Sequence, residues 1–206
     1  MGEPKTDIPF LFVGNQVCLD FINTQFVLNG SPVDLLATFS DLVAWLVHLD
    51  LLSKEEGKNL ERQWGGEKER TQTLEHARAF RFTLREMVAR IAAGKSIPQA
   101  AIETINEVLR CRIGYPQLTR RKGKFEQGFH IEAQDTNQLL GLLAEAASDM
   151  LCTCDLSLIK KCQNPACVLF FYDTTKNHAR HWCSMAMCGN RTKVAAHYRR
   201  RRRQST

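Results

Sequence analysis

The chain has 206 residues, of which 44% are hydrophobic and 24% charged, with a formal net charge of +6. These values are ordinary for a soluble globular protein, and the lack of a secretory signal or of an apolar run of about 18 residues predicts a cytoplasmic location and no membrane partner. Because the cytoplasm is reducing, the eight cysteines are expected to be thiols or metal ligands rather than disulfides.

The first quarter of the chain predicts short elements. Residues 10–13 and 17–22 are two apolar runs separated by Gly-Asn, a pattern that favours either two short strands or a strand leading into a helix. Ser-Pro at residues 31–32 marks a break. Residues 41–51 then repeat apolar side chains at helical spacing after Ser40, which is expected to cap this helix.

Longer helices are predicted in the middle of the chain. Ser53 and Glu56 have the spacing of a capping box, which opens a helix that ends near Trp64. Residues 67–93 repeat apolar side chains at steps of three and four and stop at a glycine, so they predict a long amphipathic helix. Another helix is expected to begin at Pro98.

The periodicity changes after residue 114. Residues 116–133 alternate in a way that predicts an antiparallel β-hairpin turning near Gly123. Asp135 or Thr136 is then expected to cap a last long helix.

This order of elements predicts an α+β fold with a mainly helical N-terminal domain, which also contains the β-hairpin and the short strands. A shift in charge and cysteine density near residue 156 divides the chain into residues 1–155 and residues 156–206. The second part is expected to be a small zinc knuckle followed by a basic helix.

Four cysteines in this second part have the spacing of a zinc site. Two pairs, each with four intervening residues, are separated by fifteen residues: Cys162, Cys167, Cys183 and Cys188. Zinc favours tetrahedral thiolate ligation, and four protein thiolates leave no position for a substrate, so one structural zinc ion is predicted. An iron–sulfur cluster and four unrelated buried cysteines are the alternatives. Cys152 and Cys154 are interpreted as structural, with a redox sensor as the alternative.

The residues around the second cysteine pair resemble the CGNR zinc finger. The similarity includes Cys183-Ser184-Met185, Cys188-Gly189-Asn190-Arg191 and Lys193, with Trp182 before them and Cys162, Cys167, Phe170 and Asp173 upstream. The N-terminal part resembles the ABATE domain through residues 18–24 and through Asp41, Leu42, Trp45 and Leu46. The family is described as stress-induced bacterial transcription regulators, so the resemblance implies DNA binding.

The net positive charge of the chain lies in its C-terminal tail. Nine Lys or Arg and no Asp or Glu follow Asp173, whereas residues 1–173 contain 19 basic and 22 acidic residues. Such a tail favours contact with a polyanion, and a solvated tail is the alternative. Asn190 is expected to cap the basic helix. The predicted nucleic-acid contacts are Arg191, Lys193, Arg199, Arg200, Arg201, Arg202 and Arg203.

Three functions remain open from the sequence. The first is a zinc-dependent DNA-binding transcription regulator whose N-terminal domain serves dimerisation or the sensing of a small-molecule effector. The second is an RNA- or ribosome-associated zinc protein, which a scarcity of aromatic residues near the tail disfavours. The third is an enzyme with a docking finger. The histidines are scattered and no phosphate-binding glycine loop or nucleophile elbow is present, so the chain is predicted not to be an enzyme.

Overall fold

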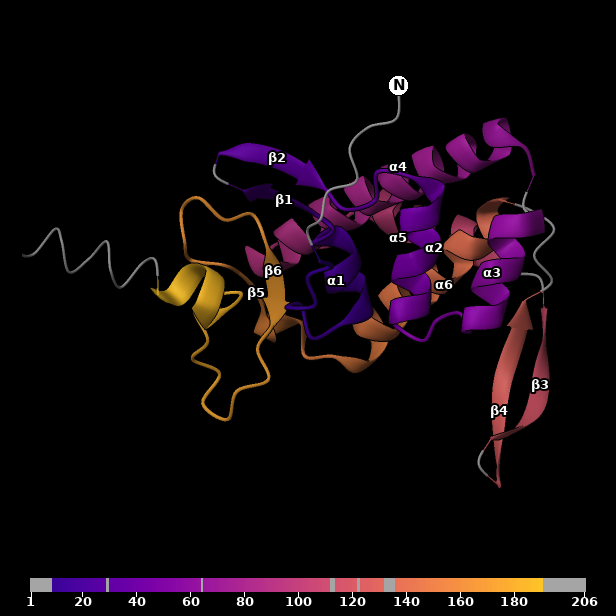
Figure 1. The fold of residues 1–206 in the computed structure, drawn as a ribbon. Helices are drawn as coiled ribbons and strands as arrows, with labels where there is room; N and C mark the ends of the chain where they lie inside the picture. The colour runs from indigo at the N-terminus through magenta and orange to yellow at the C-terminus, as the bar shows by residue number, and fades with distance from the viewer. Residues whose placement is uncertain are drawn as a thin grey trace, which may run out of the picture.

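The computed structural model describes residues 9–28, 30–63, 65–111, 114–121, 123–131 and 136–190. It is a helical body with three separate two-stranded antiparallel sheets (Figure 1). The elements, in chain order, are α1 (Val17–Ile22), β1 (Gln25–Leu28), β2 (Ser31–Asp34), α2 (Phe39–His48), α3 (Lys54–Gln63), α4 (Glu67–Ala92), α5 (Gln99–Arg110), β3 (Gly114–Arg121), β4 (Lys124–Ile131), α6 (Thr136–Thr153), β5 (Ile159–Lys161) and β6 (Phe170–Tyr172). The predicted α+β class is confirmed.

The first apolar runs form one helix and no strand. Residues 17–22 are the helix α1, whereas residues 10–13 are irregular, so the strand predicted there is wrong. Leu19, Phe21 and Ile22 are fully buried. Because α1 is covered on every side, it lacks the polar face that distinguishes a surface helix from a strand in a short sequence.

The hairpin β1–β2 was not predicted. Gln25 pairs with Asp34 and Val27 pairs with Pro32, so the Ser-Pro sequence lies in a strand and not in a break. The proline is tolerated because a two-stranded ribbon has only edge strands. From α4, the Arg81 guanidinium donates to Asp34 Oδ1 at 2.8 Å and to Thr24 Oγ1 at 2.7 Å, which fixes the hairpin on the helical body.

The helices in the middle of the chain follow the predictions closely. Ser53 and Glu56 form the predicted capping box before α3, with backbone-to-side-chain distances of 2.7 and 3.1 Å. The cap of α2 is Thr38 and not Ser40, because the capping box is formed by Thr38 and Asp41 and the helix begins two residues earlier than expected. The long helix is confirmed as α4, which is followed by Gly94 in a left-handed conformation with φ 66°.

The later elements also match their predictions. Pro98 precedes α5, the hairpin β3–β4 turns at Gly123 with φ 82°, and α6 begins at Thr136. The predicted alternative cap, Asp135, lies outside the described residues. Within the described residues, no helix has the length and apolar character needed to cross a membrane.

Two hydrophobic cores connect the helical body with the C-terminal module. The larger core is formed by α1, α2, α4, α5 and α6, and it also contains Ile159 and Phe170 of β5 and β6. The smaller core combines Phe26 and Leu35 of the N-terminal part with Leu169, Phe171 and the cysteines of the C-terminal module. The helical body therefore contributes side chains to the core of the C-terminal module, and the module contributes side chains to the core of the helical body.

Candidate metal centre and its junction with the helical body

The four predicted cysteines come from four local structures of the C-terminal module. Cys162 directly follows β5, Cys167 lies in the loop before β6, Cys183 lies in a long loop after β6, and Cys188 lies in a single π-helical turn, Met185–Gly189. All four belong to the segment at the left of Figure 1, next to α1 and the β1–β2 hairpin. The fold brings together sulfurs that are separated by up to 26 positions in the chain.

The sulfur positions fit one tetrahedral ion. All four Sγ atoms lie within 4.8 Å of one another. The Cys167–Cys183 distance is 3.8 Å and the Cys183–Cys188 distance is 3.6 Å, too long for the disulfide bond of about 2.05 Å. With zinc–sulfur bonds of about 2.3 Å, the edge of a tetrahedron is about 3.8 Å. The donor set and the spacing thus support one structural zinc ion.

Hydrogen bonds of the surrounding loops hold the cysteines in place. The Cys162 N–H donates to Leu169 O at 2.9 Å, and the Cys167 N–H donates to Asn164 O at 2.8 Å. The Asn164 side chain accepts from Ala166 N at 3.1 Å, which closes the turn between the first pair of cysteines. These bonds connect backbone atoms to neighbours within the module, so the loops themselves help to gather the four thiols.

The helical segment around Cys188 begins before Asn190, which was the predicted cap. Ser184 has extended backbone angles and its Oγ accepts from Met187 N at 3.4 Å, so Ser184 is the cap. Asn190 has helical angles of φ −65° and ψ −42° and is not the predicted cap. Gly189 packs closely under the Met185 side chain, since an added Cβ would lie 2.6 Å from Met185 Sδ and would make that side chain move. The chain therefore leaves the metal centre in helical conformation.

The thiols differ in their acidity. Hydrogen bonding from Cys183 lowers the pKa of Cys167 to about 5, and the Leu169 N–H acts in the same direction. Burial, together with the charge of Cys167, raises the pKa of Cys188 to about 11, and the hydrogen bond to Cys167 together with burial raises the pKa of Cys183 further. The negative charge of one thiolate thus disfavours the ionisation of the neighbouring thiols. A divalent cation bound between the sulfurs would offset this repulsion.

Neither nearby histidine is directed at the sulfurs. His178 Nδ1 lies 3.2 Å from Asp173 O, and the exposed His181 packs edge-on against Trp182. Among the described residues, the group whose geometry suits a metal consists of the four cysteines alone. Cys18 lies in the larger core, away from the metal centre, and burial raises its pKa to about 12.

A fully buried carboxylate organises the loop between the cysteine pairs. Asp173 accepts from Lys160 Nζ at 2.7 Å, from Thr175 Oγ1 at 2.6 Å and from Arg180 N at 2.9 Å. Burial alone would raise the pKa of Asp173, but these donors hold it well below the usual range. Asp173 belongs to the zinc-finger motif, but its role depends on contacts that the sequence does not reveal.

Arg180 joins this loop to the N-terminal part of the chain. Its guanidinium donates to Val13 O at 2.8 Å, to Trp182 O and to Cys183 O, and it lies 4.1 Å from the centre of the Phe171 ring. Arg180 therefore fixes the position of a cysteine carbonyl relative to the helical body. These bonds within the protein give Arg180 a structural role.

Two further side chains close the junction. Asn23, which is fully buried, donates to Phe170 O at 2.7 Å and accepts from Phe170 N at 3.0 Å, in the manner of a neighbouring strand. Arg85 of α4 donates to Val168 O at 3.1 Å, to Gln25 O at 2.6 Å and to Ile22 O. Neither role was predicted, since nothing in the local sequence distinguishes these two residues from other polar residues.

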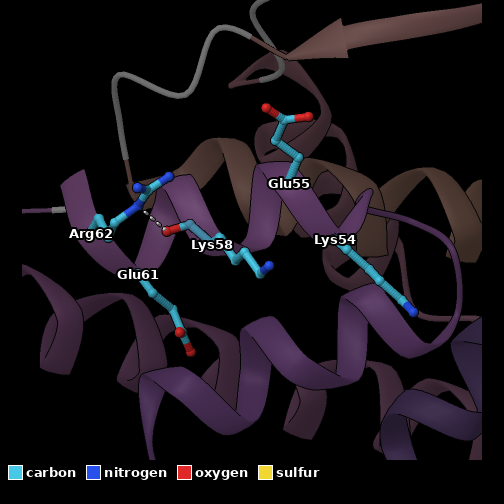
Figure 2. A pocket seen from close by; sticks show the side chains of 5 residues that line it. All are labelled: Lys54, Glu55, Lys58, Glu61 and Arg62. Carbon is cyan, nitrogen blue, oxygen red and sulfur yellow. Dashed lines mark hydrogen bonds between the residues drawn. The ribbon is translucent and has the colours of Figure 1, made fainter.

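Two surface hollows lie outside the metal centre. One, of about 590 Å³, lies beside the zinc module and is lined by Lys176, His181, Trp182 and Met185 among others. Figure 2 shows the second, of about 590 Å³, lined by Lys54, Glu55, Lys58, Glu61 and Arg62 of α3. Two carboxylates offset much of the positive charge in the second hollow, so it does not resemble a site for a polyanion.

The remaining predicted site residues lie beyond the described part of the chain. Residues 191–206 are not described, and they include all of the predicted nucleic-acid contacts: Arg191, Lys193, Arg199, Arg200, Arg201, Arg202 and Arg203. Cys152 and Cys154 are free thiols, one exposed and one half-buried, near the end of α6. A redox role for them stays a prediction.

Comparison with known protein families agrees with both predicted resemblances. The family model ABATE, described as "Putative stress-induced transcription regulator", matches residues 15–153. The family model for the CGNR zinc finger matches residues 159–201, which include the four cysteines. No curated protein matches the chain. Neither family description names an enzymatic activity.

Proposed function

Because the chain belongs to the ABATE family and ends in a CGNR zinc finger, we propose that it is a zinc-dependent DNA-binding regulator of transcription. In this proposal Cys162, Cys167, Cys183 and Cys188 ligate the structural ion, and the C-terminal tail contacts the DNA. The ion has no chemical role beyond holding the knuckle together, since four thiolates complete a tetrahedral site.

The observation that carries the proposal is the position of the basic charge. Nine Lys or Arg and no acid follow Asp173, and seven of the nine follow Asn190, where the chain leaves the Cys188 turn in helical conformation. A tail that starts from a metal-fixed turn has a defined origin and direction. Such a tail binds a polyanion with less loss of conformational entropy than a tail on a flexible linker.

The type of basic residue also favours phosphate. Arg199–Arg203 are five consecutive arginines, and the planar guanidinium group donates paired hydrogen bonds to phosphate oxygens. Such contacts supply affinity for any sequence. Arg191, next to the finger, is the proposed contact with a base edge, and Lys193 is a further phosphate contact.

The surface next to the origin of the tail is compatible with a nucleic acid. The hollow beside the zinc module offers the cation of Lys176 and the rings of His181 and Trp182. A phosphate of the duplex can pair with the Lys176 cation there. The N-terminal domain would serve dimerisation or effector sensing, and a cytoplasmic location would keep the thiolates reduced.

The tail is tested by replacing Arg199–Arg203 with serine in the zinc-loaded full chain. We expect binding to duplex DNA, measured by fluorescence anisotropy, to weaken for all sequences alike. The slope of log affinity against log salt should become shallower by about 0.9 for each phosphate that is no longer neutralised. A wild-type protein without salt-dependent binding to DNA at low ionic strength would contradict the proposal, and a preference for RNA in the same assay would favour the RNA-associated alternative.

Arg191 is tested separately, because a base contact and a structural contact have different consequences. If Arg191 contacts a base edge, Arg191→Ala should reduce discrimination between preferred and scrambled sites by about 1–3 kcal/mol and leave the salt slope nearly unchanged. A loss of zinc or of thermal stability instead would assign Arg191 to the knuckle. Sequencing of the nucleic acid that co-purifies with the protein supplies the preferred site.

A further inference from the structure

The hairpin β3–β4 projects from the helical body and packs mainly on itself. In Figure 1 it extends away from the helices at the end of the molecule opposite to the zinc module. Its eight residue pairs run from Gly114↔Ile131 to Arg121↔Lys124, and among the described elements it has no extensive contact except between its own strands. At about 3.4 Å per residue, each strand is about 27 Å long.

The charge of this hairpin differs from that of its surroundings. Residues 114–131 contain four Lys or Arg, namely Arg120, Arg121, Lys122 and Lys124, and one acid, Glu126. The rest of residues 1–173 contains 15 basic and 21 acidic residues. All four cations fall within five positions around Gly123, so the tip of the ribbon is strongly positive while the body behind it is negative.

One face of the ribbon combines a cation with exposed apolar side chains. Leu118 is 67% exposed and Phe125 is 69% exposed, although both are large and apolar. Arg120 pairs with Phe125 in the register, and its guanidinium lies 5.6 Å from the centre of the Phe125 ring. An isolated two-stranded ribbon with such a face is marginally stable in water, so the face is suited to a partner.

We infer that the hairpin β3–β4 is a second DNA-contacting element, a basic ribbon that enters a groove of the same duplex that the C-terminal tail binds. This inference rests on the proposed function. The cations at the tip, Lys124 among them, contact phosphates. Arg120, Leu118 and Phe125 face the groove, where apolar side chains contact thymine methyl groups or the edges of bases.

Charge and shape both favour duplex DNA as the occupant. The major groove is about 12 Å wide and admits a two-stranded β-ribbon. The deep groove of an RNA duplex excludes side chains. An acidic protein segment would also satisfy the cations of the tip, but under the proposed function the C-terminal tail binds DNA, and two attachments to one duplex raise the effective concentration of each.

The position of the hairpin relative to the zinc module, from which the tail continues, leads to a specific expectation about the length of the duplex. The hairpin and the zinc module lie at opposite ends of the described structure (Figure 1), so both reach DNA only on a duplex that spans the molecule. On a duplex of about 30 base pairs, three turns of the helix, both elements bind. On a duplex of about 10 base pairs, a single turn, the contribution of the hairpin should disappear.

The inference is tested with the triple variant Arg120→Gln, Arg121→Gln, Lys124→Gln. The control is Lys54→Gln, Lys58→Gln, Lys68→Gln, which removes the same charge from exposed positions on α3 and α4. On the long duplex, we expect the hairpin variant to shorten the hydroxyl-radical footprint and to lower affinity about tenfold or more. Its salt slope should become shallower by up to about three units, and the control should match wild type. Circular dichroism and zinc content show that each variant is folded.

A second variant distinguishes apolar contacts in the groove from electrostatic attraction to the phosphates. In Leu118→Ser, Phe125→Ser both side chains are already mostly exposed, so the fold should tolerate the change. We expect lower affinity for the long duplex with an unchanged salt slope.

The inference is overturned if wild type binds DNA through its tail while the hairpin and control triples have equal affinity, slope and footprint, and the proposed function then stands. If hairpin changes affect binding to RNA only, DNA is the wrong occupant. If wild type does not bind DNA, the proposed function and the inference both fail.

Discussion

Two buried carboxylates, Asp20 and Asp173, have opposite electrostatic environments. Burial raises the pKa of Asp20 to about 6, although it accepts hydrogen bonds from the Gly14 and Val13 N–H groups and lies near Arg180. Asp173 has an ion pair with Lys160 and several hydrogen-bond donors, so its pKa is lowered. Ionisation of Asp20 therefore costs stability, whereas ionisation of Asp173 contributes to it.

The first prediction concerns Asp20→Asn. Because the folded-state pKa of Asp20 is about 6 and its ordinary value is 3.8, wild type should lose stability as the pH rises from about 4 through about 6. The variant lacks this loss and keeps an oxygen that accepts the Gly14 N–H. At pH 8 it should be more stable by up to about 3 kcal/mol, since one pKa unit is about 1.4 kcal/mol. Urea titrations of both proteins from pH 4 to pH 8 measure the difference, and parallel pH profiles would contradict the prediction.

At the scale of elements, side chains replace missing strand neighbours. The β5–β6 sheet has two strands only, but Asn23 pairs with both backbone groups of Phe170, and the Tyr172 N–H donates to Gly14 O at 2.8 Å. Residues 14–23 thus complete the outer edge of β6. By taking the place of a third strand, these residues hold the zinc module on the helical body.

The second prediction concerns Asn23→Leu, which has a similar volume and no hydrogen-bonding groups. The buried Phe170 N–H and C=O would lose their partners, and each unsatisfied group costs about 1–3 kcal/mol. The free energy of unfolding should therefore fall by roughly 2–5 kcal/mol. Ser53→Ala, which removes an N-cap in a surface helix, is the control and should cost about 1 kcal/mol. Equal losses in the two variants would show that the Asn23–Phe170 contact adds little.

Across the whole molecule, the metal centre and the helical body are coupled through shared cores. Phe26 and Leu35 pack with the cysteines, and Phe170 packs with the helices. The division into residues 1–155 and 156–206 stays a prediction, since a boundary in the chain does not establish independent folding.

The third prediction concerns Cys183→Ser. Wild type should contain about one zinc per chain with four sulfur ligands at about 2.3 Å, measured by elemental analysis and X-ray absorption, and the variant should lose the ion. The helices should remain in the variant, because most of the larger core lies outside the module. The melting temperature of the helical body should still fall, because Phe26 and Leu35 lose their packing.

Cys152→Ser, at an exposed position, is the control for Cys183→Ser. An unchanged melting temperature of the helical body would show that the two parts are independent, and loss of all helical signal would show a single cooperative unit.

The sequence by itself determined the features that depend on local pattern. The spacing of Cys162, Cys167, Cys183 and Cys188, the capping box at Ser53 and the apolar period of residues 67–93 each reflect contacts within a few turns or a ligand set with a characteristic spacing. Local patterns of this kind are sufficient to predict the metal centre, the long helices and the β3–β4 hairpin.

Tertiary structure decided the features that depend on burial and on distant partners. Residues 17–22 form a helix covered on all sides, so no amphipathic pattern distinguished them from a strand. Pro32 lies in a strand because Arg81, 49 positions later in the chain, anchors the strand through Asp34. Arg180, Asn23 and Arg85 became structural residues of the metal centre only when folding brought remote carbonyl groups within hydrogen-bonding distance. A hydrogen bond between residues far apart in the chain leaves no periodic trace in the sequence, and its geometry is set by the packing of the whole molecule.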